Sequence, residues 1–306
     1  MTPAALAGQG RLATPALLPL LRALCDLKRV RSAGRAGSAA ERLFASAWAR
    51  IAAGEAEAEV ARGTVLDALA ATRLGDLDAA TLEAACVPPA EAGRIRRRAA
   101  EDAASPLDPT LREWLFGATP TASIGTPPPF VARLAAQPRA GATCPGRGRL
   151  VLEPAESHAD HCLLVAICGV ALAPAWEARA ETVFLAGLAH HLHNALLPDS
   201  GFAGETMLGA WLEPAVARAT ALALEELGPG PRARVEAARR VLPDAGSPEG
   251  RAFHAADTLD RVLQVEHHLR AAGATLAFVL NEMELVHAGP VKPFQDAVLA
   301  RMGLAA

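Results

Sequence analysis

Three histidines lie within four positions of one apolar segment, LAHHLHNALLPDSG (188–201). They are His190, His191 and His193, and the whole chain of 306 residues has only nine histidines. Neutral imidazole is a common ligand of transition metals, so a group of this density predicts metal binding wherever further ligands come within reach. On a continuous helix His191 would point about 100° away from His190, whereas Asn194 would share the face of His190.

Two other segments carry groups of the same kind. ESHADHC (156–162) has His158 and His161 three residues apart at the start of an apolar helix, where we expect His158 to be exposed. FHAADTLDR has His254 and Asp257, also three residues apart. Three predicted helices therefore offer metal-binding side chains, and helix bundles build metal sites from side chains on facing helices.

The composition narrows the classes of protein to which the chain can belong. Hydrophobic residues make up 51% of the chain, but aromatic residues only 4%, and tyrosine is absent. Core volume must come mainly from leucine, valine and alanine, which favours closely packed helices. With 30 basic and 33 acidic residues the net charge is −3, so we expect no nucleic-acid partner.

The cysteines and the apolar runs indicate the cellular compartment in which we expect the protein. The five cysteines include no CxxC pair, which favours a reducing cytoplasm. Arg22 interrupts the first apolar run, so we expect no signal peptide. The run CLLVAICGVALAPAW (162–176) is shorter than the roughly 20 residues that a membrane span needs. We therefore predict a soluble, cytoplasmic protein without a membrane partner.

An N-terminal helical domain is predicted over residues 1–117. Ser38, three residues before Glu41, predicts a capping box ahead of an amphipathic helix. Asp108 and Pro109 predict the start of a later helix, as N-cap and first helical residue.

The basic stretch KRVRSAGRAG (28–37) lies in this region, and we interpret it as solvent-exposed surface, with contact to a phosphate or an acidic partner as the alternative. It lacks the G-K-[ST] of a phosphate-binding loop, and the chain contains neither a GxSxG nor a GxGxxG motif.

Residues 118–148 are rich in proline and glycine, and we interpret them as a connector between two units. A short helix is predicted over 129–136. Ile124, Phe130 and Leu134 would anchor the connector to the surface.

Helices resume after GRGRLVLEP (146–154), which could be extended. No alternation of strands and helices appears along the chain, so the predicted fold is all-α. The C-terminal helices are predicted over residues 157–172, 176–197, 204–227, 231–241, 248–271 and 275–286.

The three segments together resemble the HD-domain superfamily of metal-dependent phosphohydrolases, whose pattern is H…HD…D on separate helices. The first motif of nucleotidase-type members typically reads ESVAEHS, which places His161 of ESHADHC at the first metal ligand. The second resembles LLHDLxEAxxGD, so LAHHLHNALLPD places His190 at the histidine and Asp199 at the final acid. Asp257 of AADTLDRVLQ takes the third position. The resemblance implies an HD-like metal-binding helical domain over 149–306.

Two positions depart from the family pattern. The aspartate of the HD pair is His191 here, and the glutamate three residues later is Asn194. In the family this aspartate binds metal and can bridge two ions, whereas imidazole offers no pair of oxygens to bridge them. The resemblance thus implies one divalent transition metal (Zn, Fe, Co, Ni or Mn), held by His161, His190, His191 and Asp257.

The resemblance also implies roles around this metal. Asn194 would orient a water but has no carboxylate with which to take its proton. Asp199 would contact the substrate or shuttle a proton. Family members place an arginine shortly before the first motif for the substrate phosphate, which points to Arg149 or Arg147. His193 would support the site without binding the metal.

The implied activity is hydrolysis of a phosphate ester, with a nucleotide or another small phosphorylated metabolite as substrate. A second interpretation is an HD domain without catalysis that serves as a binding or regulatory module, which the changed pair and glutamate positions favour. A third is an HD-fold metal oxygenase, although such enzymes generally need two irons and the bridging aspartate. The sequence leaves the formation of a homo-oligomer open.

Overall fold

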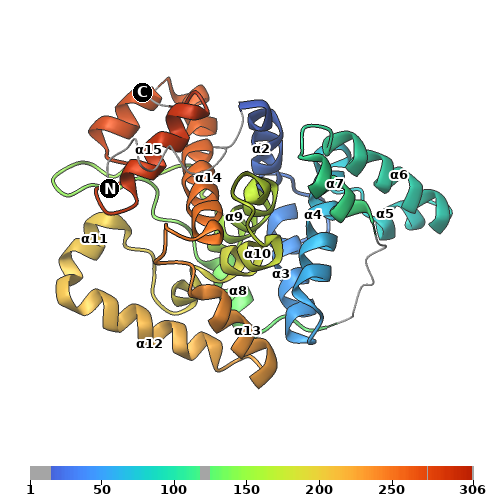
Figure 1. Ribbon diagram of the computed structural model, residues 1–306, viewed down its shortest axis with the longest axis horizontal. Coiled ribbons are helices and arrows are strands. Elements are labelled where there is room, and N and C mark those ends of the chain that lie inside the picture. The colour runs from blue at the N-terminus through green and yellow to red at the C-terminus, as the bar shows by residue number, and fades with distance from the viewer. Residues whose placement is uncertain (1–14, 118–124, 274, 305–306) are drawn as a thin grey trace.

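The structure, a computed structural model, describes residues 15–117, 125–273 and 275–304. Helices joined by turns and loops account for the regular structure of these residues, which contain no β-strand (Figure 1). The predicted all-α fold is confirmed.

The first part of the chain is helical, and two of its helices start at the predicted caps. Ser38 and Glu41 form the predicted capping box, and Asp108 accepts hydrogen bonds from the backbone N–H groups of Thr110 and Leu111. The helices are α2 (Leu18–Cys25), α3 (Ala39–Ala52), α4 (Glu57–Leu74), α5 (Ala79–Ala84), α6 (Pro89–Ala103) and α7 (Pro109–Phe116), with 3₁₀ turns at Pro15–Leu17 and Asp26–Lys28.

The predicted connector contains one helix, α8 (Pro129–Ala136), at the predicted position. Phe130 and Leu134 are fully buried, and the ring of Phe130 meets that of Trp48 edge-on with centroids 4.8 Å apart. Residues 118–124, which include the predicted anchor Ile124, lie outside the described residues. Helix α8 of the predicted connector is therefore packed into the core.

The segment between α8 and α9 (His158–Leu172) is irregular. The stretch predicted as extended, 146–154, forms no strand, and the segment is tied down by isolated bridges such as that between Pro138 and Ser157. The backbone N–H of Arg139 donates to the carbonyl of Glu156 over 2.9 Å. These contacts place residues of the predicted connector beside the start of α9.

The rest of the chain is helical with short interruptions. After α9 come α10 (Ala180–Ala189), α11 (Gly201–Leu208), α12 (Leu212–Leu224), α13 (Pro229–Arg239), α14 (Pro248–Ala272) and α15 (Lys292–Arg301). Shorter turns lie at Ala173–Trp176, Leu192–Ala195, Gly209–Trp211 and Phe278–Glu282.

Three predicted helices differ from the observed ones. The helix predicted over 176–197 ends at Ala189 and is followed by a 3₁₀ turn. The helix predicted over 204–227 breaks at Gly209, whose φ of +51° lies outside the helical region. Where a helix is predicted over 275–286, the structure has a single π-helical turn, Phe278–Glu282.

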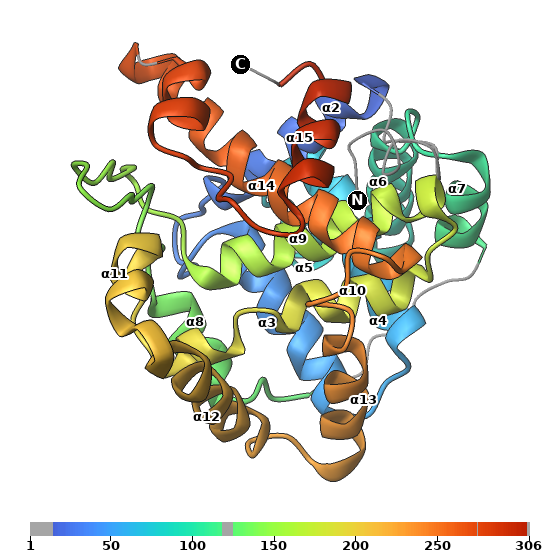
Figure 2. The ribbon, with the colours of Figure 1, turned by 60° about the vertical axis from the view of Figure 1, so that its left-hand side comes forward.

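Helix α9 is the central element, and all of its residues are buried. It packs against α10, α14 and α3, which surround it in Figure 2. Helices α9 and α10 approach closely because Gly187 has no side chain: a Cβ there would lie 2.6 Å from the Cα of Ala166. This approach brings the start of α9 next to the end of α10, where the histidines lie.

One segment, His158–Trp176, is long and apolar enough to cross a membrane. However, 89% of its most apolar window is buried inside the protein, as in the core helix of a soluble protein.

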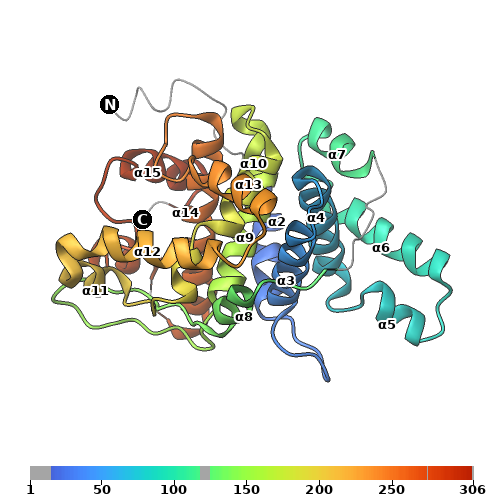
Figure 3. The ribbon, with the colours of Figure 1, turned by 90° about the horizontal axis from the view of Figure 1, so that it is seen from below.

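The buried apolar side chains form one cluster that extends from Leu17 to Leu304. Helices α5, α6 and α7 lie at one side of the molecule and α11 and α12 at the other, with α9 and α14 between them (Figure 3). The division into domains at residue 117 stays a prediction.

Candidate metal centre

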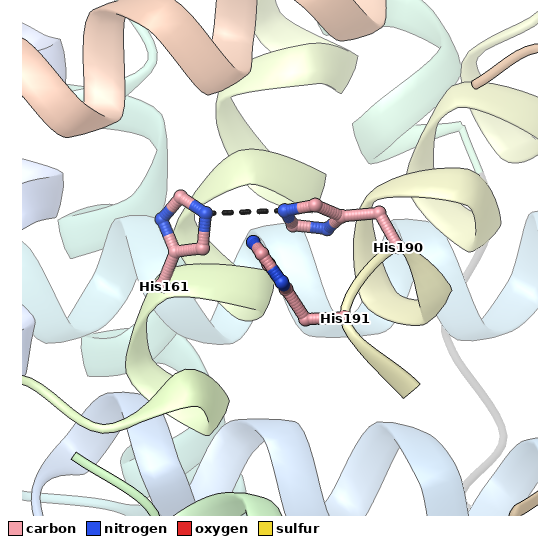
Figure 4. A group of neighbouring side chains, drawn as sticks. All are labelled: His161, His190 and His191. Carbon is pink, nitrogen blue, oxygen red and sulfur yellow. Dashed lines mark hydrogen bonds between the residues drawn. The ribbon is translucent and has the colours of Figure 1, made fainter. Parts of the chain in front are cut away.

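The four predicted metal ligands lie together where α9, α10 and α14 meet. His161 is in the first turn of α9, His190 and His191 directly follow α10, and Asp257 is on α14. The ligand nitrogens of the three histidines lie within 4.8 Å of one another (Figure 4). Nε2 of His161 is 3.1 Å from Nε2 of His190 and 3.3 Å from Oδ1 of Asp257, which is 3.9 Å from Nε2 of His190.

The end of α10 explains how two adjacent histidines reach one site. On a continuous helix His190 and His191 would point about 100° apart. The helix ends at Ala189, and the ring of His190 donates to the carbonyl of Gly187 over 2.7 Å. The chain then turns, so the rings of His190 and His191 lie with centroids 4.2 Å apart and both face His161.

The hydrogen bonds of His161 and His190 define which ring nitrogen carries the proton. Nδ1 of His190 faces the carbonyl of Gly187, which only accepts, so this nitrogen carries the hydrogen. Nδ1 of His161 is 2.7 Å from Oδ2 of Asp260. Although burial raises the pKa of Asp260, a neighbouring lysine, Lys28, and His161 hold it at about 2, so this carboxylate also accepts. The Nε2 atom of each ring is therefore the one turned to the other ring, and a proton or a metal ion can be held between the two.

His191 is oriented in the same way by Asn194. The amide nitrogen of Asn194 donates to the carbonyl of Leu197, so its oxygen accepts from Nδ1 of His191 over 2.8 Å. Nε2 of His191 is then the acceptor, and Nη1 of Arg139 lies 2.9 Å from it. Asn194 is buried and does not line the adjoining cavity, and its amide oxygen holds the ring of His191.

The donor set suits a transition metal. Burial lowers the pKa of His190 and His191 well below the usual value, and the neighbouring histidines lower both further, so both rings are neutral at pH 7. Two nitrogens bound to one zinc ion in tetrahedral geometry lie about 3.3 Å apart, close to the 3.1 Å between His161 and His190. Two such lone pairs face each other stably only with a proton or a cation between them. Each ring also donates its Nδ1 hydrogen to an acceptor, as metal-bound histidines do.

A buried lysine from the first part of the chain completes the surroundings. Nζ of Lys28 is 2.7 Å from Oδ1 of Asp260 and 2.6 Å from Oε2 of Glu156, and its side chain is 1% exposed. Burial alone would lower the pKa of Lys28, but Asp260 and Glu156 raise it above its usual value. The interpretation of 28–37 as solvent-exposed surface is wrong for Lys28, because two buried carboxylates compensate its charge.

Lys28 also accounts for a second group of possible ligands. Glu156, His161 and Asp260 place ligand atoms within 4.8 Å of one another. The ammonium of Lys28 contacts both carboxylates of this group, and Nδ1 of His161 is used by Asp260. The positive charge that the two acids require is thus already supplied by the chain.

A cavity of about 290 Å³ is lined by His190, His191 and Asp257. Arg139 and Arg261 bring positive charge to it, and Phe202, another lining residue, stacks on His287 with ring centroids 4.0 Å apart. His287 is thus one of the residues that line the cavity. Nη1 of Arg261 is 3.5 Å from Oδ2 of Asp257, so Oδ1 is the oxygen turned to the histidines.

The two arginines predicted to face the substrate lie outside this cavity. Arg149 is exposed and donates weakly to the carbonyl of Ser200 over 3.4 Å, and Arg147 pairs with Glu282 on the surface. Neither lines the cavity. Arg139 does, because the chain between α8 and α9 folds back over the start of α9.

Asp199 lines the cavity, as expected of a residue that contacts substrate. Its oxygens accept from the backbone N–H groups of Ala140 and Gly201, each over 2.9 Å. Burial raises its pKa, but His158, Arg139 and these N–H groups hold it well below the usual value. These two hydrogen bonds fix the carboxylate of Asp199 in the wall of the cavity, and its role toward a substrate stays a prediction.

The prediction that His158 is exposed is wrong. The side chain of His158 is fully buried, with Nε2 3.5 Å from Oδ2 of Asp199 and its ring 4.9 Å from that of His191. The capping box of Ser157 and Asp160 starts α9 inside the protein, so the first turn has no solvent face. His193 is half-buried beside His191, with ring centroids 5.4 Å apart, and is absent from the group of possible ligands.

Four charged residues beside the candidate ligands have no predicted role in the site. Asp260 and Arg261 lie three and four residues after Asp257, and this helical spacing is a signal that places all three on one side of α14. Lys28 and Arg139 have no such signal, since they lie on segments far from the histidines in the sequence.

No protein-family model, no curated protein and no solved structure matches this chain. The HD-domain resemblance therefore rests on the three sequence segments and stays a prediction.

Proposed function

We propose that this protein is a metal-dependent hydrolase of a phosphate ester, with a nucleotide or another small phosphorylated metabolite as substrate. The observation that carries the proposal is the convergence of three histidines, each with its Nδ1 hydrogen donated away from the site and its Nε2 turned toward Asp257 or a cationic neighbour. One divalent transition metal would be held by His161, His190, His191 and Asp257.

When bound, such an ion supplies Lewis acidity and makes a bound water more acidic. A set of three neutral imidazoles and one carboxylate leaves an excess charge of +1 on a divalent ion. Because the ligands are softer than an all-oxygen set, zinc, iron, cobalt, nickel or manganese is favoured over magnesium.

Arg139 and Arg261 would bind the anionic substrate. Both guanidinium groups line the cavity beside the histidines, and only about a fifth of each side chain is exposed. Hydrogen bonds from a partly buried arginine to a phosphate are short and strong, and the charge stabilises the more anionic transition state. Phe202 and His287 would contact the uncharged part of the substrate.

A second candidate is a binding module without catalysis, and one contact favours it. Nη1 of Arg139 lies 2.9 Å from Nε2 of His191 and already satisfies the lone pair that a metal would need. In this case the arginines and the neutral histidines would bind a small phosphorylated ligand, and no metal would be required.

Elemental analysis of the untagged protein, beside its His191→Ala and His193→Ala variants, separates the two candidates. The hydrolase should contain about one equivalent of a transition metal, lost in His191→Ala and kept in His193→Ala. It should also release phosphate from p-nitrophenyl phosphate or a nucleoside monophosphate, and metal removal should abolish the release. Phosphate binding by a metal-free wild type that does not turn over would instead support the binding module.

A further inference from the structure

We propose that Lys28, supplied by the first part of the chain, is a positioning residue of the metal centre and acts through Asp260 on His161. This inference rests on the proposed metal site. It makes residues far outside the histidine segments part of the machinery that sets metal affinity.

The contacts form a continuous chain from Lys28 to the ligand nitrogen. Nζ of Lys28 lies 2.7 Å from Oδ1 and 2.9 Å from Oδ2 of Asp260. Oδ2 of Asp260 in turn lies 2.7 Å from Nδ1 of His161, whose opposite nitrogen faces His190 and Asp257. The side chains of Asp260 and His161 are both fully buried.

The negative charges of two buried carboxylates require a cation, and Lys28 supplies it. Asp260 and Glu156 are buried carboxylates that share one ammonium, and the next nearest cation, Nε of Arg139, is 3.7 Å from Glu156. Without a cation between them, two buried carboxylates repel each other and are poorly solvated. Without Lys28, Asp260 would turn toward other partners, and His161 would lose the acceptor that fixes its ring and raises its basicity as a ligand.

Lys28 could join the two parts of the chain, orient His161 through Asp260, or do both. A neighbouring ion pair allows these two roles to be separated. Arg22, on α2, pairs with Glu266 on α14 over 2.6 Å. This pair joins the same two regions as Lys28 and Asp260, but Arg22 is partly exposed, and neither partner contacts a histidine ligand in the described hydrogen bonds. Arg22→Met is therefore a matched control for the loss of one such link.

The test is Co²⁺ binding, measured by competition with a chelator and by the visible absorption of the bound ion. Lys28→Met should bind Co²⁺ about 10–100-fold more weakly than the wild type, as for other residues that orient metal-bound histidines. The absorption spectrum should also change, Lys28→Arg should recover part of the affinity, and Arg22→Met should match the wild type. Unchanged affinity and spectrum in Lys28→Met would overturn the inference.

A double-mutant cycle keeps the test decisive if Lys28→Met folds poorly. If Lys28 acts through Asp260, the Lys28→Met/Asp260→Asn variant should bind Co²⁺ about as well as Asp260→Asn alone. If the losses of Co²⁺ affinity in the two single variants multiply in the double variant, the proposed route through Asp260 is contradicted. The wild type separates this inference from the proposed function: a wild type that does not bind Co²⁺ refutes the metal centre, whereas a wild type that binds it beside an unaffected Lys28→Met refutes only the role of Lys28.

Discussion

The Nε2 atoms of His161 and His190 lie 3.1 Å apart, and the Nδ1 atom of each ring donates to an acceptor behind it. Reversing either tautomer would leave Nδ1 as a second lone pair facing the oxygen of Asp260 or Gly187. The direction of the ligand nitrogens is therefore set by the fold, so little ordering of these rings has to accompany metal binding.

Asn194 should act on metal affinity through His191. Replacing it with alanine removes the oxygen that holds the Nδ1 hydrogen, so His191 can place its hydrogen on Nε2 or rotate. Chelator competition should show Zn²⁺ binding about 10-fold weaker in Asn194→Ala, and Asn194→Asp, which keeps an acceptor, should bind at least as tightly as the wild type. Equal affinity in Asn194→Ala and the wild type would rule out this role.

Arg139 and Arg149 should differ sharply in substrate binding. Arg139 lines the cavity beside His191, whereas Arg149 is exposed outside it. A hydrogen bond to a charged group contributes about 1.5–3 kcal/mol, so Arg139→Met should weaken binding of inorganic phosphate about 10–100-fold. Arg149→Met should bind phosphate like the wild type in the same titration. The opposite ranking would restore the arginine that the sequence pattern indicates.

Gly187 should be intolerant of a side chain because of its contact with α9. A Cβ there would meet the Cα and N of Ala166 at 2.6 and 2.7 Å, and backbone atoms do not yield as a flexible side chain does. We expect Gly187→Ala to lower the free energy of unfolding by about 1–3 kcal/mol in urea titrations. The matched control is Gly93 in α6, where a Cβ meets nothing within 4 Å. Gly93→Ala should instead stabilise by about 0.5–1 kcal/mol. Comparable effects at both positions would contradict the close packing of α9 and α10.

The sequence predicts the histidine ligands because their signal is local. His161, His190, His191 and Asp257 stand out as polar groups in apolar helices, and the structure brings them together. The geometry around them depends on where helices end. Between Gly187 and Pro198 the sequence has neither a glycine nor a proline to stop α10, so a continuous helix is the natural prediction. A side-chain hydrogen bond from His190 to Gly187 accompanies the end of the helix there, and single-sequence patterns do not carry that information.

The charged surroundings of the site are set by tertiary contacts. In the sequence, Lys28 is one of several basic residues in a polar stretch. It is buried against Asp260 because the first part of the chain packs on α14. Arg139 lies in a stretch rich in proline and glycine that predicts a connector, and its place in the cavity depends on the fold-back onto Glu156. Local sequence signals therefore identify the candidate ligands, whereas the charged residues around them come from distant segments.

Acid should destabilise the metal-free protein through its buried histidines. Burial lowers the pKa of His158 to about 4, below the value of 6.5 that it has in the unfolded chain. Between these values the unfolded state binds more protons than the folded state, so stability rises with pH and is lost as the pH falls from about 6.5 toward 4. Between pH 7 and pH 5 the titration of His158 alone should lower the free energy of unfolding by about 2 kcal/mol.

Urea midpoints of chelator-treated wild type and His158→Gln, measured at both pH values, check this prediction. The variant should lose less stability than the wild type on acidification, because glutamine does not titrate. The same loss in both proteins would mean that His158 is not held neutral by its burial beside Asp199 and His191.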